Sequence, residues 1–311
     1  MGTWPTTKTS YTAGHFELAL DGSPTTAYLK SVDGGFINHA LIDERIGPEN
    51  MSIKHASVAD IEPISFEFGM AGSSGVLKWI QDSWRKNYGA RSGQITHANF
   101  NLQSTYEHAF SDALITETTF PTLDGASKEA AYMKVKCQPA AVATKKVGGQ
   151  KLSGGKLTTK QKLWMCSGFR LNIDGIDDIR YTNKIDSFTI KQGVKKMYTG
   201  PMRFPELTPT KIDFPNLTGT ISLEFADGVL DWYQKYVASG KKDPSMQKSG
   251  SIEFLSPARD EVLFRVNLYW VSILKAQIVQ STANSDQIKR VKFELYVGNM
   301  DIDGKGELGM E

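Results

Sequence analysis

Two stretches of the chain carry one pattern: Gly75-Val-Leu-Lys-Trp-Ile-Gln-Asp-Ser-Trp84 and Gly228-Val-Leu-Asp-Trp-Tyr-Gln-Lys-Tyr-Val237. Gly, Val, Leu, Trp and Gln recur at the same places, 153 residues apart. Each stretch has apolar residues at i, i+3 and i+7, which line one face of a helix. These are Leu77, Ile80 and Trp84 in the first copy, and Leu230, Tyr233 and Val237 in the second. We predict one amphipathic helix per copy, with Ser73 or Ser74 and Asp227 as N-caps.

A second landmark repeats with the same offset. Phe16-Glu-Leu-Ala-Leu20 alternates apolar residues and ends in the turn pair Asp21-Gly22. Phe169-Arg-Leu-Asn-Ile173 followed by Asp174-Gly175 does the same 153 residues later. Two landmarks with one offset indicate an internal duplication.

The segments between the landmarks read as strands and loops in matching order. Thr26–Val32 and Gly35–Ile42 are predicted to pair, as are Asp178–Ile185 and Ser187–Val194. Polar connections follow at 43–63 and 195–217; they are long for hairpin loops, and we expect them to grip a neighbour. The remaining predicted strands are Ile64–Phe68, Arg91–Ile95 and Ala130–Val135 running into Cys137, matched by Gly219–Phe225, Lys248–Ile252 and Ile288–Val297.

The pattern predicts a mainly β (α+β) protein of two tandem antiparallel β-barrels or sandwiches, each flanked by one helix. We expect an N-terminal arm at 1–13, a first domain at 14–142, a Lys/Gly-rich linker at 143–163 and a second domain at 164–311. The stretch 143–162 holds six lysines, two Gly-Gly pairs and no acid, which is typical of a flexible linker.

Composition limits the classes of protein to which this chain can belong. The 311 residues are 40% hydrophobic and 23% charged, and no apolar run reaches the ~18 residues of a membrane span. The N-terminal residues lack the apolar core of a secretory signal, so we expect synthesis in the cytoplasm without a signal peptide or membrane anchor. Cys137 and Cys166 form no disulfide framework. A net charge of +2 does not predict specific nucleic-acid binding.

No catalytic, cofactor-binding or metal-binding residues are predicted. The five histidines have no zinc-site spacing and are expected to be surface or partly buried residues: His15, His39, His55, His97 and His108. Asn299–Gly304 begins like an EF-hand loop but lacks its final Glu and reads as a solvated tail. The pairs Ser104 with His108, and Asp177-Asp178 with Asp286, show no arrangement typical of a general acid and base. The sequence therefore points away from an enzyme.

The order of these elements resembles the tail-tube family of contractile phages and related injection systems. The resemblance is clearest at Phe169–Gly175, at Gly228–Val237, and from Gly250–Phe254 through Leu274–Gln277 to Val291–Val297. The first half looks like a diverged copy. The resemblance implies a small β-barrel with a flanking helix, six of which form a ring whose sheets join into a continuous inner wall.

The resemblance also implies the partners. The chain is expected to associate with itself into rings and to contact neighbouring tube, baseplate hub or sheath proteins. The assembled particle would be a virion tail or an extracellular injection particle, and DNA can pass through its lumen. Two barrels per chain allow a pseudo-hexameric trimer or a double-layer hexamer. The alternative is a tandem β-barrel that binds a ligand or carbohydrate without catalysis. In that case aromatic side chains should cluster on loops, whereas Trp79, Trp84, Trp232, Tyr233 and Tyr236 lie on the predicted helices.

Overall fold

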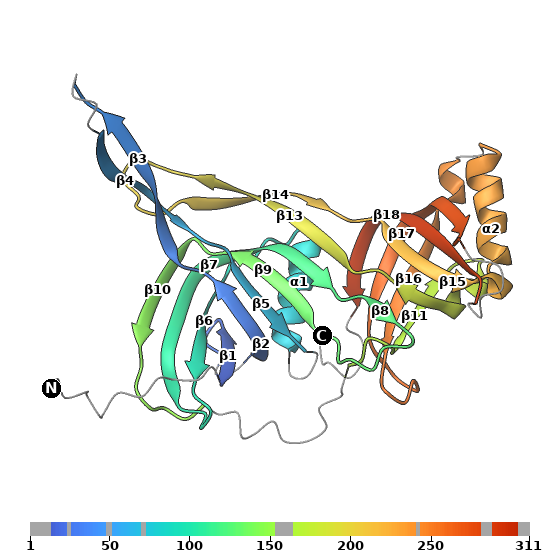
Figure 1. Ribbon diagram of the computed structural model, residues 1–311, viewed down its shortest axis with the longest axis horizontal. Helices are drawn as coiled ribbons and strands as arrows, with labels where there is room; N and C mark the ends of the chain where they lie inside the picture. The colour runs from blue at the N-terminus through green and yellow to red at the C-terminus, as the bar shows by residue number, and fades with distance from the viewer. Residues whose placement is uncertain are drawn as a thin grey trace.

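The computed structural model describes residues 14–23, 26–47, 52–69, 73–152, 164–240, 243–280 and 288–303. It is a mainly β protein, and the predicted fold class is confirmed. Two β-rich bodies lie side by side and are bridged by a long hairpin (Figure 1). The predicted arm at 1–13 and Asp286 lie outside the described residues.

The first body is a closed six-stranded barrel. Its strands follow the order β7-β6-β1-β2-β5-β9, and β9 pairs back onto β7 to close the ring. Their bounds are β1 His15–Leu20, β2 Ala27–Gly34, β5 Ile64–Phe68, β6 Arg91–Ala98, β7 Ser104–Phe120 and β9 Met133–Gln138. The first half of the duplicated sequence thus forms the predicted barrel.

Both predicted helices are present. Helix α1 spans Ser74–Trp84 and buries Leu77, Ile80 and Trp84, as the spacing predicted. Helix α2 spans Asp227–Tyr233 and continues as one π-helical turn to Ala238. The predicted cap at Asp227 is wrong, because Ala226 occupies the N-cap position and Asp227 lies in the first turn. Ser73 does hold the N-cap position of α1, but its hydroxyl donates to the Gly69 carbonyl instead of capping a backbone N–H.

The second body is an open sheet of the order β11-β16-β17-β18-β15-β12-β8. Its strands are β11 Phe169–Ile173, β12 Thr182–Ile185, β15 Leu217–Ser222, β16 Lys248–Leu255, β17 Val262–Ile278 and β18 Arg290–Asp303, with β8 Leu123–Asp124 added from the first half. The sheet is open between β11 and β12 because the first part of the predicted strand at 178–185 is a 3₁₀ helix, Asp177–Tyr181. That helix leaves β12 too short to reach β11.

Strand pairing confirms the duplication residue by residue. Leu29 pairs with Phe68, and Thr182 pairs with Ile221, each residue exactly 153 positions from its counterpart. The same β-bulge follows in both pairs, between Leu29 and Ser31 and between Thr182 and Lys184. A bulge bends a strand at a fixed point, so the two halves share their backbone curvature.

Two sequence predictions for this region are wrong. The strands predicted at 35–42 and 187–194 are present as β3, Ile37–Arg45, and β13, Phe188–Met197. The connections predicted as polar loops, 43–63 and 195–217, instead contain strands β4, Ser52–Ile61, and β14, Glu206–Asp213, which pair back onto β3 and β13 as long hairpins. The predicted pairing of β2 with β3, and of β12 with β13, does not occur, because β3 pairs with β4 and β13 with β14 and β7. Hydrogen bonding along these hairpins satisfies a polar backbone that a loop would expose to water.

Two further stretches differ from their predictions. The start of the predicted linker is strand β10, Ala141–Lys146, which pairs with β7 beyond the end of β9. Asn299–Asp303 is no solvated tail; it belongs to β18, with Met300 and Ile302 buried. Cys137 lies in β9 as predicted, whereas Cys166 lies in a turn before β11, and both are free and buried.

Candidate assembly surface

The two halves of the chain are joined by a shared sheet. Strand β7 is 17 residues long, and β6 pairs only with its first part, up to Ala113. The edge that remains at Glu117–Phe120 pairs antiparallel with Phe188–Lys191 of β13. The β13–β14 hairpin therefore extends the first body with strands from the second half, and it runs across the barrel in Figure 1. We call this contact the internal junction.

Aromatic packing fills the internal junction. Phe120 is fully buried and stacks on Phe188, with ring centroids 4.7 Å apart and planes 12° apart. It also stacks on Phe254 of β16 at 5.7 Å and meets Trp84 of α1 at 6.2 Å. One side chain of the first half thus packs against two strands of the second half, and the apolar core is continuous across the junction.

Polar contacts fix the register. The hydroxyls of Thr119 and Thr189, which lie opposite each other, are 2.9 Å apart and hydrogen-bonded. The Ser83 hydroxyl of α1 donates to the side-chain oxygen of Gln192. Because Ser83 and Gln192 are both buried, a register slip would leave their polar atoms without partners.

An ion pair extends the junction toward the other hairpin. Lys196 Nζ of β13 lies 2.5 Å from Asp60 Oδ1 of β4 and 3.3 Å from the Ile61 carbonyl. The hydrogen bond from Lys196 holds the pKa of Asp60 below its usual value. Asp60 is about half exposed, so this pair orients the hairpin more than it stabilises it.

Helix α1 makes a second contact between the halves. Arg85 forms a bidentate pair with Asp301 of β18, at 2.9 and 2.7 Å, and Asp301 raises the pKa of the guanidinium further. Gln81 Nε2 donates to the Ile302 carbonyl of the same strand. These contacts join α1 of the first half to the end of β18, which is paired with β17 through Asp303.

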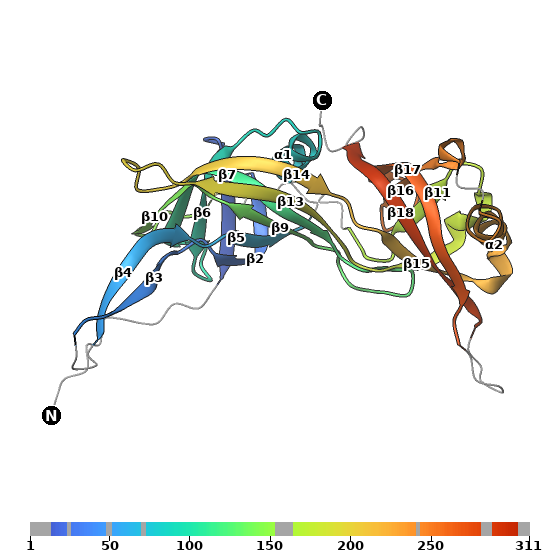
Figure 2. The same cartoon turned by 90° about the horizontal axis from the view of Figure 1, so that it is seen from above.

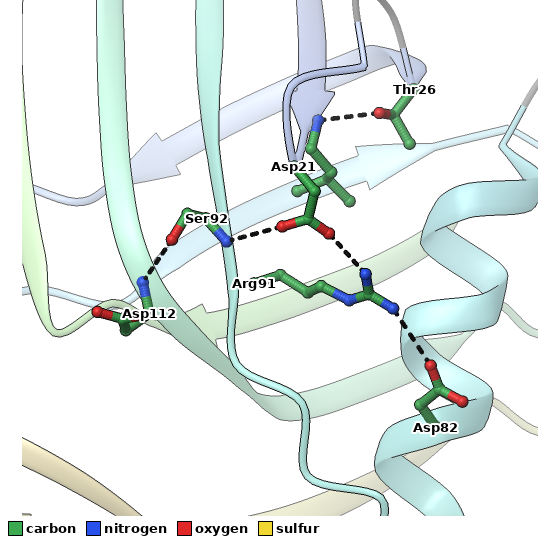
Figure 3. A network of polar contacts seen from close by, with 7 residues as sticks. Asp21, Thr26, Asp82, Arg91, Ser92 and Asp112 are labelled. Carbon is green, nitrogen blue, oxygen red and sulfur yellow. Dashed lines mark hydrogen bonds and ion pairs between the residues drawn. The ribbon is translucent and has the colours of Figure 1, made fainter.

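Within each half, charged side chains link neighbouring elements. Figure 3 shows Arg91 of β6 between Asp21, in the turn after β1, and Asp82 of α1, at 2.6 and 3.3 Å. The arrangement ties the turn, the strand and the helix of the barrel to one guanidinium. Ser92 extends it by donating from its backbone N–H to Asp21 and accepting from the Asp112 N–H.

The second half has its own charge cluster. Glu253 of β16 is buried and accepts hydrogen bonds from Arg170 and Arg265 on the neighbouring strands. Burial alone would raise the pKa of Glu253, but the hydrogen bonds from the two arginines outweigh it and lower the pKa. The cluster links β11, β16 and β17 through side-chain hydrogen bonds.

The residues screened for chemistry lie apart from one another. His15, His39 and His55 are exposed, whereas His97 is half-buried and His108 is buried, with its pKa lowered by that burial. No hydrogen bond joins Ser104 to His108 in the described residues. The part of the chain that the structure describes holds no group of three metal-ligating side chains. Nor does any described helix have the length and apolar character to cross a membrane.

One family model matches the chain. It describes the T4-like virus tail tube protein gp19 and matches residues 12–139. The resemblance to the tail-tube family is confirmed. The match falls on the first half, which the sequence marked as the diverged copy, and not on the second half, where the resemblance was expected to be clearest. The first half is also the one whose barrel is closed.

Several solved structures are similar to part of the chain. One is a chain of the sheath–tube complex of an extracellular contractile injection system, PVC, with 18% identity and a TM-score of 0.40 over 47% of this chain and 100% of that one. Another is from the anti-feeding prophage tube-terminating cap, at 16% identity and 0.39, covering 47% and 97%. Hcp1 from Flavobacterium johnsoniae follows at 12% and 0.27, covering 44% and 94%. None of the curated proteins compared matches this chain.

The polar connections expected to grip a neighbour were 43–63 and 195–217, after the third predicted strand of each half. The segment that binds the other half of the same chain is instead Phe188–Lys191 of β13, within the predicted strand that precedes the second connection. Thr119 and Thr189 gave no signal, because threonines opposite one another are visible only once the strands are paired.

Proposed function

We propose that this protein is a non-enzymatic structural subunit of a contractile phage tail or a related injection system. Three chains would form a ring of six barrel-type domains around a central channel. The ring would belong to the inner tube or to its baseplate-proximal end, where a trimeric ring could connect threefold and sixfold parts. Assembly with tube, sheath or hub proteins belongs to the same proposal.

The internal junction carries this proposal. The closed barrel of the first body and the open sheet of the second body are lateral neighbours. They are joined by strand pairing, with β13 on β7 and β8 on β12. A ring whose sheets join into one wall needs this kind of lateral contact, whereas two stacked layers would need contacts along the ring axis. The junction therefore favours the trimer over the double-layer hexamer.

The proposal is tested by mass photometry of the full chain, with negative-stain imaging of the same sample. Particles of three times the 34.4 kDa chain mass, with a central hole, are expected. Particles of six chains would favour the double-layer arrangement. A monomer at every accessible concentration would contradict ring formation by the chain alone and favour the tandem binding module.

A further inference from the structure

The internal junction uses only one of two equivalent hairpins and one of two equivalent edges. Within the described residues, β3 pairs only with β4, and the β3–β4 hairpin projects from the molecule (Figure 1). Strand β17 pairs with β16 only through Val271, so the edge from Ser272 to Ile278 opposite β18 pairs with no described strand. Each of these surfaces has a counterpart that is paired inside the chain.

The two hairpins match in register. Asn38 pairs with Asp60, and Lys191 pairs with Asp213, each 153 positions apart. The irregularity after His39 in β3 recurs after Gln192 in β13. The β3–β4 hairpin therefore has the backbone shape of the hairpin that binds β7.

The two edges match as well. Leu114 and Ile115 of β7 pair with Gln138 and Cys137, and a bulge precedes Glu117. Exactly 158 positions later, Ser272 and Ile273 of β17 pair with Tyr296 and Leu295, and a bulge precedes Lys275. Lys275–Ile278 is thus the counterpart of Glu117–Phe120, the segment that binds β13.

Burial distinguishes the used surfaces from the unused ones. Phe120 and Ile190 at the internal junction are 0% and 2% exposed. Their counterparts Ile278 and Ile37 are 58% and 38% exposed, and Phe36 beside Ile37 is 53% exposed. Unpaired strand edges with exposed apolar side chains favour the addition of another strand.

We propose that the β3–β4 hairpin of one chain adds to the β17 edge of a second copy, repeating the internal junction between chains. The inference rests on the proposed function and specifies the surface through which its ring closes. The expected antiparallel pairs are Phe36 with Gln277, Ile37 with Ala276 and Asn38 with Lys275 of the neighbouring copy. Gly35 is the counterpart of Phe188, but its φ of 81° ends the ladder at Phe36.

This contact is head-to-tail. The β3–β4 hairpin and the end of β17 lie at opposite ends of the molecule (Figure 2). A heterologous contact of this kind makes a ring when its rotation closes and a filament when it does not. The ion pair of the internal junction is not repeated, because Asp43 and Asp213 stand where Lys196 and Asp60 stand. The contact between chains therefore relies on the strand ladder and on apolar side chains.

The test is a pair of matched disulfides in the full chain. F36C combined with Q277C places two cysteines opposite each other across the proposed contact. T119C combined with T189C occupies the equivalent positions of the internal junction, where the native hydroxyls are 2.9 Å apart. Native Cys137 and Cys166 are buried. A third variant, F36C with K275C, is displaced by two residues and serves as the register control.

Oxidation and non-reducing electrophoresis separate the outcomes. T119C/T189C should give a cross-linked monomer, and F36C/Q277C should give covalent dimers and trimers that form at least ten times faster than with F36C/K275C. Mixing the single variants F36C and Q277C should give mainly the mixed dimer. Rings in mass photometry without F36C/Q277C cross-links would overturn the inferred surface and leave the proposed function standing. Monomers without cross-links would overturn both.

Discussion

Replacing Phe120 by Ala should destabilise the whole chain rather than the first barrel alone. The ring is fully buried and contacts Trp84, Phe188 and Phe254, which belong to elements of both halves. Removing a fully buried phenylalanine ring costs about 3–5 kcal/mol, because apolar burial is lost and a cavity remains. We expect a loss of about 4 kcal/mol in the free energy of unfolding, at the middle of this range. That equals roughly 8 °C in Tm, at about 2 °C per kcal/mol for a large domain.

The assay is urea unfolding of monomeric protein, followed by tryptophan fluorescence and by far-UV circular dichroism. Phe100→Ala is the matched control, because Phe100 is 81% exposed and its loss should cost well under about 1 kcal/mol. Both probes should report one transition, shifted to lower urea in the Phe120 variant. A loss below about 1 kcal/mol would refute the junction packing. Two separate transitions, of which only one shifts, would show that the halves unfold independently.

Two further predictions concern buried ionisable groups. The pKa of Glu253 is lowered in the folded state, so its stabilising contribution is present above its unfolded-state pKa and is lost as the pH falls through the folded-state pKa. Glu253→Gln should therefore flatten the acid side of a stability–pH curve and cost about 1–3 kcal/mol at pH 7, since Arg170 and Arg265 lose their carboxylate; an unchanged slope below pH 5 would contradict this. Burial raises the pKa of Cys137 to about 12, so a thiol reagent at pH 8 should label it only after denaturation. Labelling of Cys137 in the folded protein, seen by peptide mass analysis, would contradict its burial.

The parts of the fold that face a core were predictable from sequence. The helices and the strands β1, β5 and β11 alternate or space their apolar residues toward one buried face, and that signal is local. Strand β4 has little such signal, because only Ala59 and Ile61 at its end are buried. Without a buried face along most of its length, this segment reads as a polar loop, whereas most of β3 was predicted as a strand. Strand β4 is visible only through its hydrogen bonds to β3.

Which strands pair with each other could not be predicted from the sequence, for a different reason. Alternation predicts that Phe188–Lys191 is a strand with one buried face, but any free edge of matching polarity satisfies it. The partner at Glu117–Phe120 follows only from where β6 ends along β7. The end of β18 is a contrasting case. Met300 and Ile302 continue the alternation, so a strand signal was present, but the acids of the same stretch also resemble the start of an EF-hand loop.

Backbone irregularities, more than side chains, are what the two halves share. Asp112 and Trp270 occupy equivalent places 158 residues apart, and both have positive φ, at 49° and 54°. An aspartate and a tryptophan have little in common chemically, so the kink matters here and not the residue that makes it. The same holds for the bulges before Glu117 and Lys275, which set how each long strand presents its edge.

The two halves differ in whether their sheet closes into a barrel, and the strand pairing that follows from this difference joins them. Strand β2 pairs with β1 and closes the first barrel, whereas β12 does not reach β11 and takes β8 from the first half instead. In return, β13 from the second half covers the edge of β7. Each half thus completes a sheet of the other, and separating them would expose unpaired edges on both sides. This reciprocal exchange is the physical reason to expect one cooperative unfolding transition, and it leaves the β3–β4 hairpin and the end of β17 as the matching pair of unused surfaces.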